Sequence, residues 1–428
     1  MPSADWHSDP GGFLRSLALR AIAAAHPRAC LRPALGNLDG RRSWTVLGAG
    51  KAAGAMAAVA AEVFANRASG LVIVPENSPV EPTGNIEVLR GSHPVPSPRG
   101  AAAARQLLER ARSSRDQGEL LFLLSGGASS LLALPPDRVA LDELVAISRQ
   151  LLRSGATIRE INVVRKCVSL CAGGRVAAAA HPGAIRTLVI SDVPGDDIEV
   201  IGSGPTVGST STAADARQIL QRYRIATSKE VQAHLEAPEA EPLHPGAAEL
   251  SGAKFSIVAS GMTALRAAEE IALASGLRVL NLGDTVEGES RVVAATHARM
   301  VRSMRSRSAP VQPPCLLLSG GETTVTLGDS TGRGGRNSEY ALALLAALSD
   351  TDEIWALACD TDGIDGTGSN AGAAFGPSSR QGALQMGLDA ERFLQAHDSC
   401  GFFERIDGLF VTGPTGTNVN DFRAVLVR

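Results

Sequence analysis

The sequence predicts an α/β fold divided into two domains, and three observations support this prediction. First, 428 residues are more than one ordinary hydrophobic core can cover, so two domains are expected. Second, a hydrophobic content of 44% with 45 glycines and only 4% aromatic residues is typical of an α/β chain rich in tight turns. Third, short apolar runs alternate with helix-forming stretches along most of the chain, as in folds that layer helices on a sheet.

The first half of the chain supplies one set of alternating elements. Short apolar runs that stop at glycine, serine or proline predict buried strands, and stretches rich in alanine and leucine predict helices. Residues 1–35 mix apolar residues with arginines, which predicts an amphipathic opening helix packed on this domain. The predicted strands are 44–47, 71–74, 120–124 and 187–190, and the predicted helices are 52–65, 101–112, 141–152 and 158–172.

The second half repeats the alternation and predicts a second doubly wound layer. Residues 236–253, rich in proline, alanine and glutamate, indicate a linker or peripheral loop before it. We therefore expect one domain at 1–240 and another at 254–428. The predicted strands of the second are 255–258, 278–282, 315–318, 354–358 and 409–411, and its predicted helices include 263–275, 290–305 and 338–348.

Charge, hydropathy and cysteine usage exclude several classes of protein. A formal net charge of -3 and a pI near 6.3 give no positive field to attract nucleic acid. No run approaches the roughly 20 apolar residues of a membrane span, and Arg20 interrupts the one apolar stretch near the N-terminus, so neither a membrane anchor nor a signal peptide is expected. The six scattered cysteines form no zinc pattern and indicate reduced thiols in a cytoplasmic protein. Monomer and homodimer both stay open.

A glycine turn after the first predicted strand carries a lysine. Gly48 and Gly50 form the turn, and Lys51 stands next to the following helix. Strand, Gly-x-Gly turn and helix are part of a dinucleotide-binding fingerprint, but no acidic residue closes the second strand, which runs into Pro75. A lysine at a helix N-terminus opposes the helix dipole, which indicates that a ligand such as phosphate supplies a negative charge. A plain surface lysine is the alternative.

One loop sequence occurs twice, once in each half. An apolar strand runs into Ser-Gly-Gly, one further residue and two hydroxyl residues, at 125–130 and again at 319–324. Consecutive backbone N–H groups and hydroxyls suit the oxygens of phosphate or carboxylate. If the two halves face each other, both loops line one cleft. The predicted binding residues are Ser125, Gly126, Gly127 and Ser129 in the first loop and Gly320, Gly321, Glu322 and Thr323 in the second.

A further glycine-rich turn, GRGGRN at 332–337, carries two arginines. It leads into an apolar helix with Glu339 in its first turn. Free N–H groups at a helix N-terminus, beside glycines and a guanidinium, are suited to hold a phosphate. Arg336 and Asn337 are therefore predicted to meet the ligand, and a glycine-rich hairpin without a ligand is the alternative.

Aspartates follow two of the predicted strands. Asp192 lies just beyond 187–190, and Asp360 and Asp362 lie just beyond 354–358. An acid past the carboxyl end of a buried strand lies where open α/β sheets place their chemistry. Asp192 is predicted to bind Mg²⁺ or to act as a base. Asp360 and Asp362 are predicted to hold Mg²⁺ partly through a nucleotide, since the glutamate that would end a calcium loop is missing.

These motifs keep one order over most of the chain, from Trp44 to Asp421, and carry a family resemblance. They read GAGKAAGAM, LLSGGASSLL, SGATIREINVVRK, SDVPGDD with IGSGPTV, LSGGETTVT, GRGGRNSEYALAL, DTDGIDG and TGPTGTNVND. In them the chain resembles the glycerate kinases that carry a C-terminal MOFRL domain. It departs from the family pattern at Cys167, where a histidine is usual, at Ser338-Glu339-Tyr340, where Gln-Glu-Leu is usual, and at the turn 259–263.

The resemblance implies a reaction, an architecture and a catalytic pair. It implies ATP-dependent phosphorylation of D-glycerate, usually at the 2-hydroxyl, in a cleft between two domains. These are a Rossmann-like parallel-sheet domain at 1–240 and a smaller mixed α/β domain at 254–428, which holds the MOFRL region at about 313–422. Lys51 and Arg336 match the family's proposed catalytic pair.

Both lines of reasoning lead to one hypothesis for the mechanism. Negative charge spreads over the oxygens of a phosphoryl group in transfer, so cations, backbone donors and in-line positioning matter more than a strong base. Lys51 and Arg336 would neutralise that charge, and Asp192 with Asp360 or Asp362 would hold Mg²⁺ or orient the attacking hydroxyl. The alternatives are a hydroxypyruvate reductase that uses NAD(P)H, disfavoured by the missing ribose-binding acid, phosphorylation at the 3-hydroxyl, and a noncatalytic protein that binds small anions.

Overall fold

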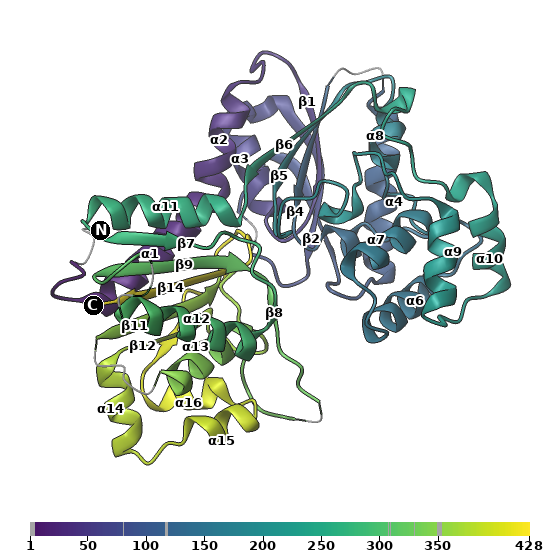
Figure 1. Cartoon of the computed structure of the whole chain (residues 1–428). Helices are drawn as coiled ribbons and strands as arrows, with labels where there is room; N and C mark the ends of the chain where they lie inside the picture. The colour runs from purple at the N-terminus through teal and green to yellow at the C-terminus, as the bar shows by residue number, and fades with distance from the viewer. Residues whose placement is uncertain are drawn as a thin grey trace. The chain divides into compact units, whose positions relative to one another are not determined.

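The chain folds into two compact units. The computed structural model describes residues 5–79, 81–115, 119–306, 308, 310–328, 330–348 and 353–428. One unit is Pro27–Val258, called here the parallel-sheet unit, and the other joins Met1–His26 to Ala259–Arg428 and is called the mixed-sheet unit (Figure 1). The expected domains, 1–240 and 254–428, differ from these units mainly in residues 1–26. These residues belong with the C-terminal half because helix α1 (Pro10–Ala25) packs against helix α11 (Gly261–Ala274).

The parallel-sheet unit is built on six strands in the order β3-β2-β1-β4-β5-β6. The pairings from β3 through to β5 are all parallel, as expected for strands joined by crossover helices. This confirms the predicted Rossmann-like sheet. The strands are β1 Trp44–Ala49, β2 Ala68–Pro75, β3 Asn85–Gly91, β4 Leu120–Ser125, β5 Ile185–Ile190 and β6 Ala253–Ala259.

The helices of this unit form two hydrophobic cores. One core lies between the sheet and helices such as α4 and α8, and the other joins α6, α7, α9 and α10 to one another. The helix predicted at 158–172 ends early, at Cys167, because Val168 leaves helical geometry. The α-helices are α2 Pro27–Gly36, α3 Ala53–Phe64, α4 Pro98–Ser113, α5 Ala128–Leu131, α6 Leu141–Arg153, α7 Ile158–Cys167, α8 Arg175–Ala180, α9 Ala213–Arg222 and α10 Lys229–Glu236, and short 3₁₀ turns are Ala65–Arg67, Ile201–Ser203, Pro238–Ala240 and Ala248–Leu250.

The mixed-sheet unit has a six-stranded sheet in the order β13-β12-β11-β14-β9-β7. Strands β7 and β9 pair in parallel, whereas the other neighbours are antiparallel, which confirms the predicted mixed sheet. A short parallel pair, β8 with β10, lies apart from it. The strands are β7 Arg278–Asn281, β8 Gly288–Glu289, β9 Cys315–Gly321, β10 Thr323–Thr324, β11 Ile354–Asp360, β12 Gly372–Phe375, β13 Leu409–Phe410 and β14 Asp421–Val427.

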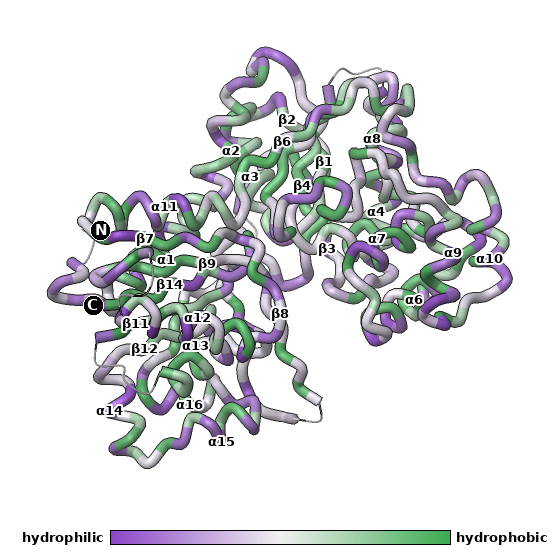
Figure 2. Tube along the Cα trace, in the orientation of Figure 1, coloured by the Kyte–Doolittle hydropathy of each residue, from purple (hydrophilic) through white to green (hydrophobic). Residues whose placement is uncertain are grey.

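Helices cover both faces of this sheet. Side chains alternate along each strand, so one set of strand residues packs against α12 and α13 and the other set lies toward α1 and α11. Figure 2 shows the hydrophobic colour concentrated along strands such as β9 and along α13. The helices not yet given are α12 Ser290–Arg305, α13 Arg336–Ala347, α14 Pro377–Gln385, α15 Ala390–Gln395 and α16 Ser399–Arg405.

Among the described residues, five strands were not predicted from the sequence, namely β3, β8, β10, β12 and β14, and short length or polar residues explain why. Strand β14 begins at Asp421 and contains Arg423, so the run does not read as a buried strand, although every residue in it is buried. Strand β3 carries charged residues, and β12 is only four residues long. In the described part of the chain, no helix combines the length and the apolar character that crossing a membrane requires.

Candidate functional site

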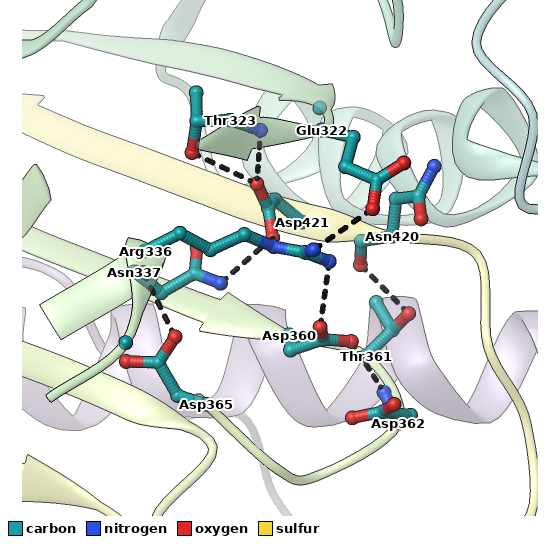
Figure 3. Close-up of polar contacts among 12 residues, drawn as sticks. Glu322, Thr323, Arg336, Asn337, Asp360, Thr361, Asp362, Asp365, Asn420 and Asp421 are labelled. Carbon is teal, nitrogen blue, oxygen red and sulfur yellow. Dashed lines mark hydrogen bonds and ion pairs between the residues drawn. The ribbon is translucent and has the colours of Figure 1, made fainter. Parts of the chain in front are cut away.

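The ends of three neighbouring strands meet in the mixed-sheet unit. Gly321, the last residue of β9, pairs with Asp421 at the start of β14, and Asp421 pairs with Asp360 at the end of β11. Because β14 runs antiparallel to its neighbours, its first residue lies beside their last residues. The next residues along the chain, Glu322 and Thr323, therefore enter the same region, as Figure 3 shows.

Arg336, the first residue of α13, is held at this edge by three carboxylates. Its Nε donates to Asp421 Oδ1 at 2.7 Å, its Nη2 to Asp360 Oδ2 at 2.7 Å, and its Nη1 to Glu322 Oε1 at 2.9 Å (Figure 3). Burial would lower the pKa of Arg336, but these carboxylates raise it above its ordinary value, so the guanidinium stays charged. A guanidinium has five N–H groups, and three are used here among the described residues.

Asp421 is the central acceptor of the cluster. Its side chain is 0% exposed and receives hydrogen bonds from Arg336, from Asn337 Nδ2 at 2.7 Å, and from the backbone N–H of Thr323 at 3.1 Å. Its second oxygen also accepts from the buried guanidinium of Arg423. Burial alone would raise the pKa of Asp421, but Arg423 and Arg336 hold it below the ordinary aspartate value. Asp421 therefore remains ionised and fixes the direction of Arg336.

The N-terminus of α13 does not offer the free N–H groups expected from the sequence. The backbone N–H groups of Asn337 and Ser338 donate to the two carboxylate oxygens of Asp365, at 2.9 and 2.8 Å. Asp365 is almost fully buried, and burial raises its pKa even though these two N–H groups act in the opposite direction. The prediction of a phosphate at this helix N-terminus is therefore wrong in its reasoning, because a carboxylate of the same chain occupies the position.

Asn337 is part of the support beneath Arg336. Its side chain is 0% exposed, and its amide donates to Asp421. A side chain without exposed surface lies too deep to meet a ligand unless the chain opens. The structure thus gives Asn337 a positioning contact, and its predicted ligand contact stays a prediction.

Asp360 and Asp362 lie on the loop that follows β11. One oxygen of Asp360 accepts from Arg336, and the other accepts from the backbone N–H of Asp362 at 3.0 Å. Asp362 in turn accepts from the N–H of Ile364 at 2.9 Å, so the carboxylates also shape the turn. Within the part of the chain that the structure describes, no group of three acidic, histidine or cysteine side chains is placed to hold a metal ion.

The second Ser-Gly-Gly copy is a strand end rather than an open turn. Gly320 donates its N–H to Gly283 O at 2.8 Å, and the position of a β-carbon on Gly321 lies 2.3 Å from Val286 O. Gly321 has a φ of +116°, so these glycines allow close backbone approach by the segment before β8. The expectation that Gly320 presents a free N–H to an anion is therefore wrong.

In the parallel-sheet unit, the Lys51 turn and the first Ser-Gly-Gly loop lie together. The N–H of Lys51 donates to Gly126 O at 2.8 Å, and the N–H of Ala52 donates to Ser125 Oγ at 3.0 Å. A β-carbon on Gly50 would lie 2.2 Å from Ser125 Oγ, so only glycine lets the two loops approach. The carboxyl ends of β1 and β4 are neighbours, which explains the contact. Gly48 packs equally closely against Leu123 of β4.

Two other predicted residues, Ser129 and Asp192, belong to the same unit. Asp192 lies two residues beyond β5, which neighbours β4. Ser129 lies in α5, and its hydroxyl is 2.9 Å from that of Ser203. Gly127, with a φ of +81°, precedes α5 (Ala128–Leu131) as its N-cap and turns the chain from the strand into the helix.

One sequence argument against dinucleotide binding does not hold. Strand β2 ends at Pro75, and Glu76 follows it directly, so an acid does stand at the end of the second strand. The sheet order β3-β2-β1-β4-β5-β6 is also that of dinucleotide-binding folds. However, the backbone N–H groups of this turn, which would face a pyrophosphate, already donate hydrogen bonds within the chain, from Lys51 to Gly126 O and from Ala52 to Ser125 Oγ.

Sequence reasoning missed three residues of the mixed-sheet cluster: Asp421, Arg423 and the capping role of Asp365. All three are almost fully buried. Asp421 and Asp365 meet groups from other parts of the sequence, whereas Arg423 pairs with Asp421, two residues earlier on the same strand. The one usable signal was the pair of charges at alternate positions of DFRAVLV, which places both on the same face of a strand.

The six cysteines, all within the described residues, are free thiols.

Comparisons with known proteins give one consistent family. A model described as a domain of unknown function (DUF4147) matches residues 13–236, and the model of the MOFRL family matches residues 315–421. A D-glycerate 2-kinase of Thermotoga maritima is 33% identical over 403 residues, which is 94% of each chain. A protein of Agrobacterium vitis named "Putative hydroxypyruvate reductase" is 42% identical over 417 residues, 97% of this chain and 94% of that one. The crystal structure of a Thermotoga maritima glycerate kinase matches with a TM-score of 0.89 at 32% identity, covering 98% of this chain and 100% of that chain.

Proposed function

Since this chain belongs to the family of MOFRL-type glycerate kinases, we propose that it transfers the terminal phosphoryl group of ATP to the 2-hydroxyl of D-glycerate, with Mg²⁺. The name of the Thermotoga maritima relative supports both the acceptor and the position of phosphorylation. The proposal places the catalytic groups on both units, with Lys51 from one and Arg336 from the other.

The observation that carries the proposal is the fixed guanidinium of Arg336. Three carboxylates set its direction, its side chain is 24% exposed, and two of its N–H groups remain for a ligand among the described residues. A donor whose direction is set before the reaction stabilises charge in the transition state, because no free energy is spent on reorienting it during the reaction. Phosphoryl transfer needs this kind of group, because its transition state carries charge on the equatorial oxygens.

Lys51 is the proposed second cation. It stands at the carboxyl end of β1, between that strand and α3, where open α/β sheets bind their ligands. Its backbone N–H donates to Gly126 O, and this hydrogen bond fixes the position of the Lys51 Cα from which the side chain extends. We propose that its ammonium contacts the phosphates of ATP, and that Ser125, Gly126 and Gly127 shape the turn around it.

The carboxylates offer a chemically suitable, incomplete set of Mg²⁺ ligands. Mg²⁺ prefers oxygen ligands and commonly takes only one or two carboxylates, with substrate phosphates and water in the other positions. Asp360 and Asp362 in one unit, and Asp192 in the other, fit that requirement as hard oxygen donors. The ion would neutralise phosphate charge, while these residues hold it and Asp192 orients the attacking hydroxyl.

A coupled assay tests the proposal directly. ADP release should depend on D-glycerate, ATP and Mg²⁺ together, and phosphorus NMR should identify 2-phosphoglycerate. Lys51→Ala and Arg336→Ala should each lower kcat by about 100-fold or more, since each removes a group that stabilises transferred charge. The double variant should lose less than the product of the two effects, because both groups act on one phosphoryl group.

The control for Arg336 is Arg333, three residues earlier in the same turn. Its guanidinium is exposed and pairs with the exposed Glu404 at 2.7 Å. Arg333→Ala should therefore keep normal turnover. Normal turnover in Arg336→Ala as well would remove Arg336 from the mechanism, and 3-phosphoglycerate as product would correct the regiochemistry.

A reductase is the second candidate, favoured by Glu76 at the end of β2 and by the sheet order. An acid at that position binds the ribose of NAD in dinucleotide-binding folds. The measurement is oxidation of NADPH or NADH with hydroxypyruvate, without ATP. Oxidation that Glu76→Ala abolishes would establish the reductase, and ligand binding without either reaction would leave a noncatalytic anion-binding protein.

A further inference from the structure

A pocket in the parallel-sheet unit lies beside the first Ser-Gly-Gly loop. It is a small pocket that opens to solvent. Apolar residues such as Leu132 and Leu144 form part of the wall, and the polar side chains in the wall are Ser129, Ser130, Ser148, Arg165, Ser169 and Ser203. A mostly apolar wall with a few polar groups is typical of a site for a small molecule.

Most hydroxyl hydrogens in this pocket are used by the protein itself. Ser203 donates to Asn162 Oδ1 at 3.0 Å, so the contact of 2.9 Å between Ser129 and Ser203 requires Ser129 to donate. Ser130 donates to Gly127 O at 3.0 Å, and Ser169 donates to Leu132 O at 3.2 Å. These four serines therefore fix the shape of the pocket and leave no hydroxyl hydrogen for a ligand.

Arg165 and Ser148 are the exceptions. Neither side chain has a hydrogen bond or an ion pair among the residues that the structure describes, and both line the pocket. Ser148 lies on α6 and is 8% exposed, and Arg165 lies in the last turn of α7. The neighbouring Lys166, by contrast, is paired with Glu199 at 3.0 Å.

An arginine in this position needs a negative partner. Burial lowers the pKa of Arg165, and no carboxylate of the described chain compensates for the lost water. A guanidinium nevertheless stays charged in proteins. The desolvation free energy of Arg165 is therefore offset only when an anion binds beside it. Its planar fork matches the two oxygens of a carboxylate.

We infer that this pocket binds the carboxylate of the acceptor acid, with the guanidinium of Arg165 and the hydroxyl of Ser148 as its donors. The inference rests on the proposed function, because that function supplies a small 2-hydroxy acid as the substrate. It makes Arg165 the residue that distinguishes an acid from a neutral polyol. The surrounding apolar wall strengthens the ion pair by excluding water.

The test compares Arg165→Met with Arg153→Met. Arg153 occupies the last turn of the adjacent helix α6 but is exposed and outside the pocket, so the control repeats the chemical change and the helix position. Arg165→Met should raise the KM for D-glycerate by about 10- to 100-fold, the loss expected for a charge-assisted hydrogen-bonded pair. The KM for ATP should change by less than about twofold, and Arg153→Met should change neither.

Two further variants separate binding from folding. Arg165→Lys keeps the charge but not the fork, so its KM for D-glycerate should lie between those of the wild type and Arg165→Met. Ser148→Ala should raise the same KM by a few-fold, about the effect of one hydrogen bond. The melting temperature of Arg165→Met should not fall, because the substitution removes a partly buried charge that no carboxylate of the described chain compensates.

Each result decides between readings. A selective rise in the KM for ATP would assign Arg165 to a nucleotide phosphate, and a lower melting temperature with unchanged KM values would make it a structural cation of the α7 terminus. Either overturns the inference. If the wild type does not phosphorylate D-glycerate, the proposed function fails separately. Calorimetric titration with D-glycerate, D-lactate and glycerol then still tests the pocket, since only the two acids should bind, and only with Arg165 present.

Discussion

Replacing Asp421 with asparagine tests whether this carboxylate holds the Arg336 cluster together. Asparagine keeps the size of the side chain but removes the charge between two guanidiniums, and its amide hydrogens face groups that are themselves donors. Arg336, Arg423, Asn337 and Thr323 all direct N–H or O–H groups at Asp421. The substitution therefore leaves buried positive charge without its partner.

The expected loss of stability follows from the burial of these groups. Asp421 is 0% and Arg423 is 1% exposed, and removing one partner of a buried ion pair costs about 3–5 kcal/mol. For a unit of about 200 residues, 1 kcal/mol corresponds to roughly 2–4 °C in melting temperature, so a decrease of about 6–20 °C is expected. Turnover should fall by about 100-fold, because Arg336 loses the charged acceptor of its Nε.

Calorimetry and steady-state kinetics on Asp421→Asn and Glu322→Gln provide the measurement. Glu322 also pairs with Arg336, but its side chain is 46% exposed, and exposed pairs contribute only about 0–1 kcal/mol. Because the pKa of Asp421 is lowered in the folded protein, its contribution is complete above the ordinary aspartate pKa and is lost only in acid. The difference between variant and wild type should thus be constant between about pH 6 and pH 8. If Asp421→Asn melts no lower than Glu322→Gln, the cluster is not the support described above.

Three other perturbations have defined outcomes. Gly50→Ala would place a methyl carbon 2.2 Å from Ser125 Oγ at a φ of +132° and should cost about 1–3 kcal/mol, whereas Gly36→Ala, with nothing within 4 Å, should melt like the wild type. Burial, with Arg423 nearby, lowers the pKa of His297 to about 4, so neutral His297 stabilises the fold above the ordinary histidine pKa, and about 2 kcal/mol of that stability is lost between pH 7 and pH 5. The melting temperature of His297→Gln should therefore decrease less from pH 7 to pH 5 than that of the wild type. Equal decreases in the two proteins would contradict this. Chelation of Mg²⁺ by EDTA should stop turnover without lowering the melting temperature, because no three-residue metal cluster occurs among the described residues; a large decrease in melting temperature would indicate a structural ion.

The fold class could be predicted because its signals are local. Strand β4 and most of β9 are continuous apolar runs, and a run of that kind indicates a strand buried on both faces whatever its partners are. The order of the strands depends on pairings between segments separated in the sequence, such as Cys315 with Val427, and the assignment of α1 depends on its packing against the distant helix α11. No local pattern carries that information.

The candidate site could be predicted only where its residues stand in turns. Arg336 and Asp360 follow glycine-rich or strand-end patterns and were identified. Asp421 and Arg423 were missed because charged residues normally indicate exposure, whereas these two are buried and pair with each other along one face of β14. A buried ion pair is thus visible only after the strands are placed.

The repeated Ser-Gly-Gly loop shows how one pattern can serve different purposes. At Ser125 the hydroxyl accepts the N–H of Ala52 and fixes the Lys51 turn, whereas Ser319 Oγ, in the other copy, is buried without a partner among the described residues. In the second copy Gly321 permits close approach of the segment before β8, whereas the close approach to Ser125 in the first copy is permitted by Gly50 of the Lys51 turn. The same sequence pattern therefore ends a buried strand in each unit but makes different contacts there.

The charge balance around Arg336 limits how a nucleotide can approach it. Arg336 and Arg423 contribute two positive charges, while Asp421, Asp360 and Glu322 contribute three negative charges, so this group alone is net negative. A bare triphosphate would be repelled by the exposed Glu322 even as Arg336 attracts it, and at an effective dielectric constant of about 20 a pair of like charges 4 Å apart costs about 4 kcal/mol. A divalent ion that travels with the phosphates would reverse that sign. The same three carboxylates that keep Arg336 in place therefore require a further source of positive charge when a phosphate binds there, and the Mg²⁺ proposed above would be such a source.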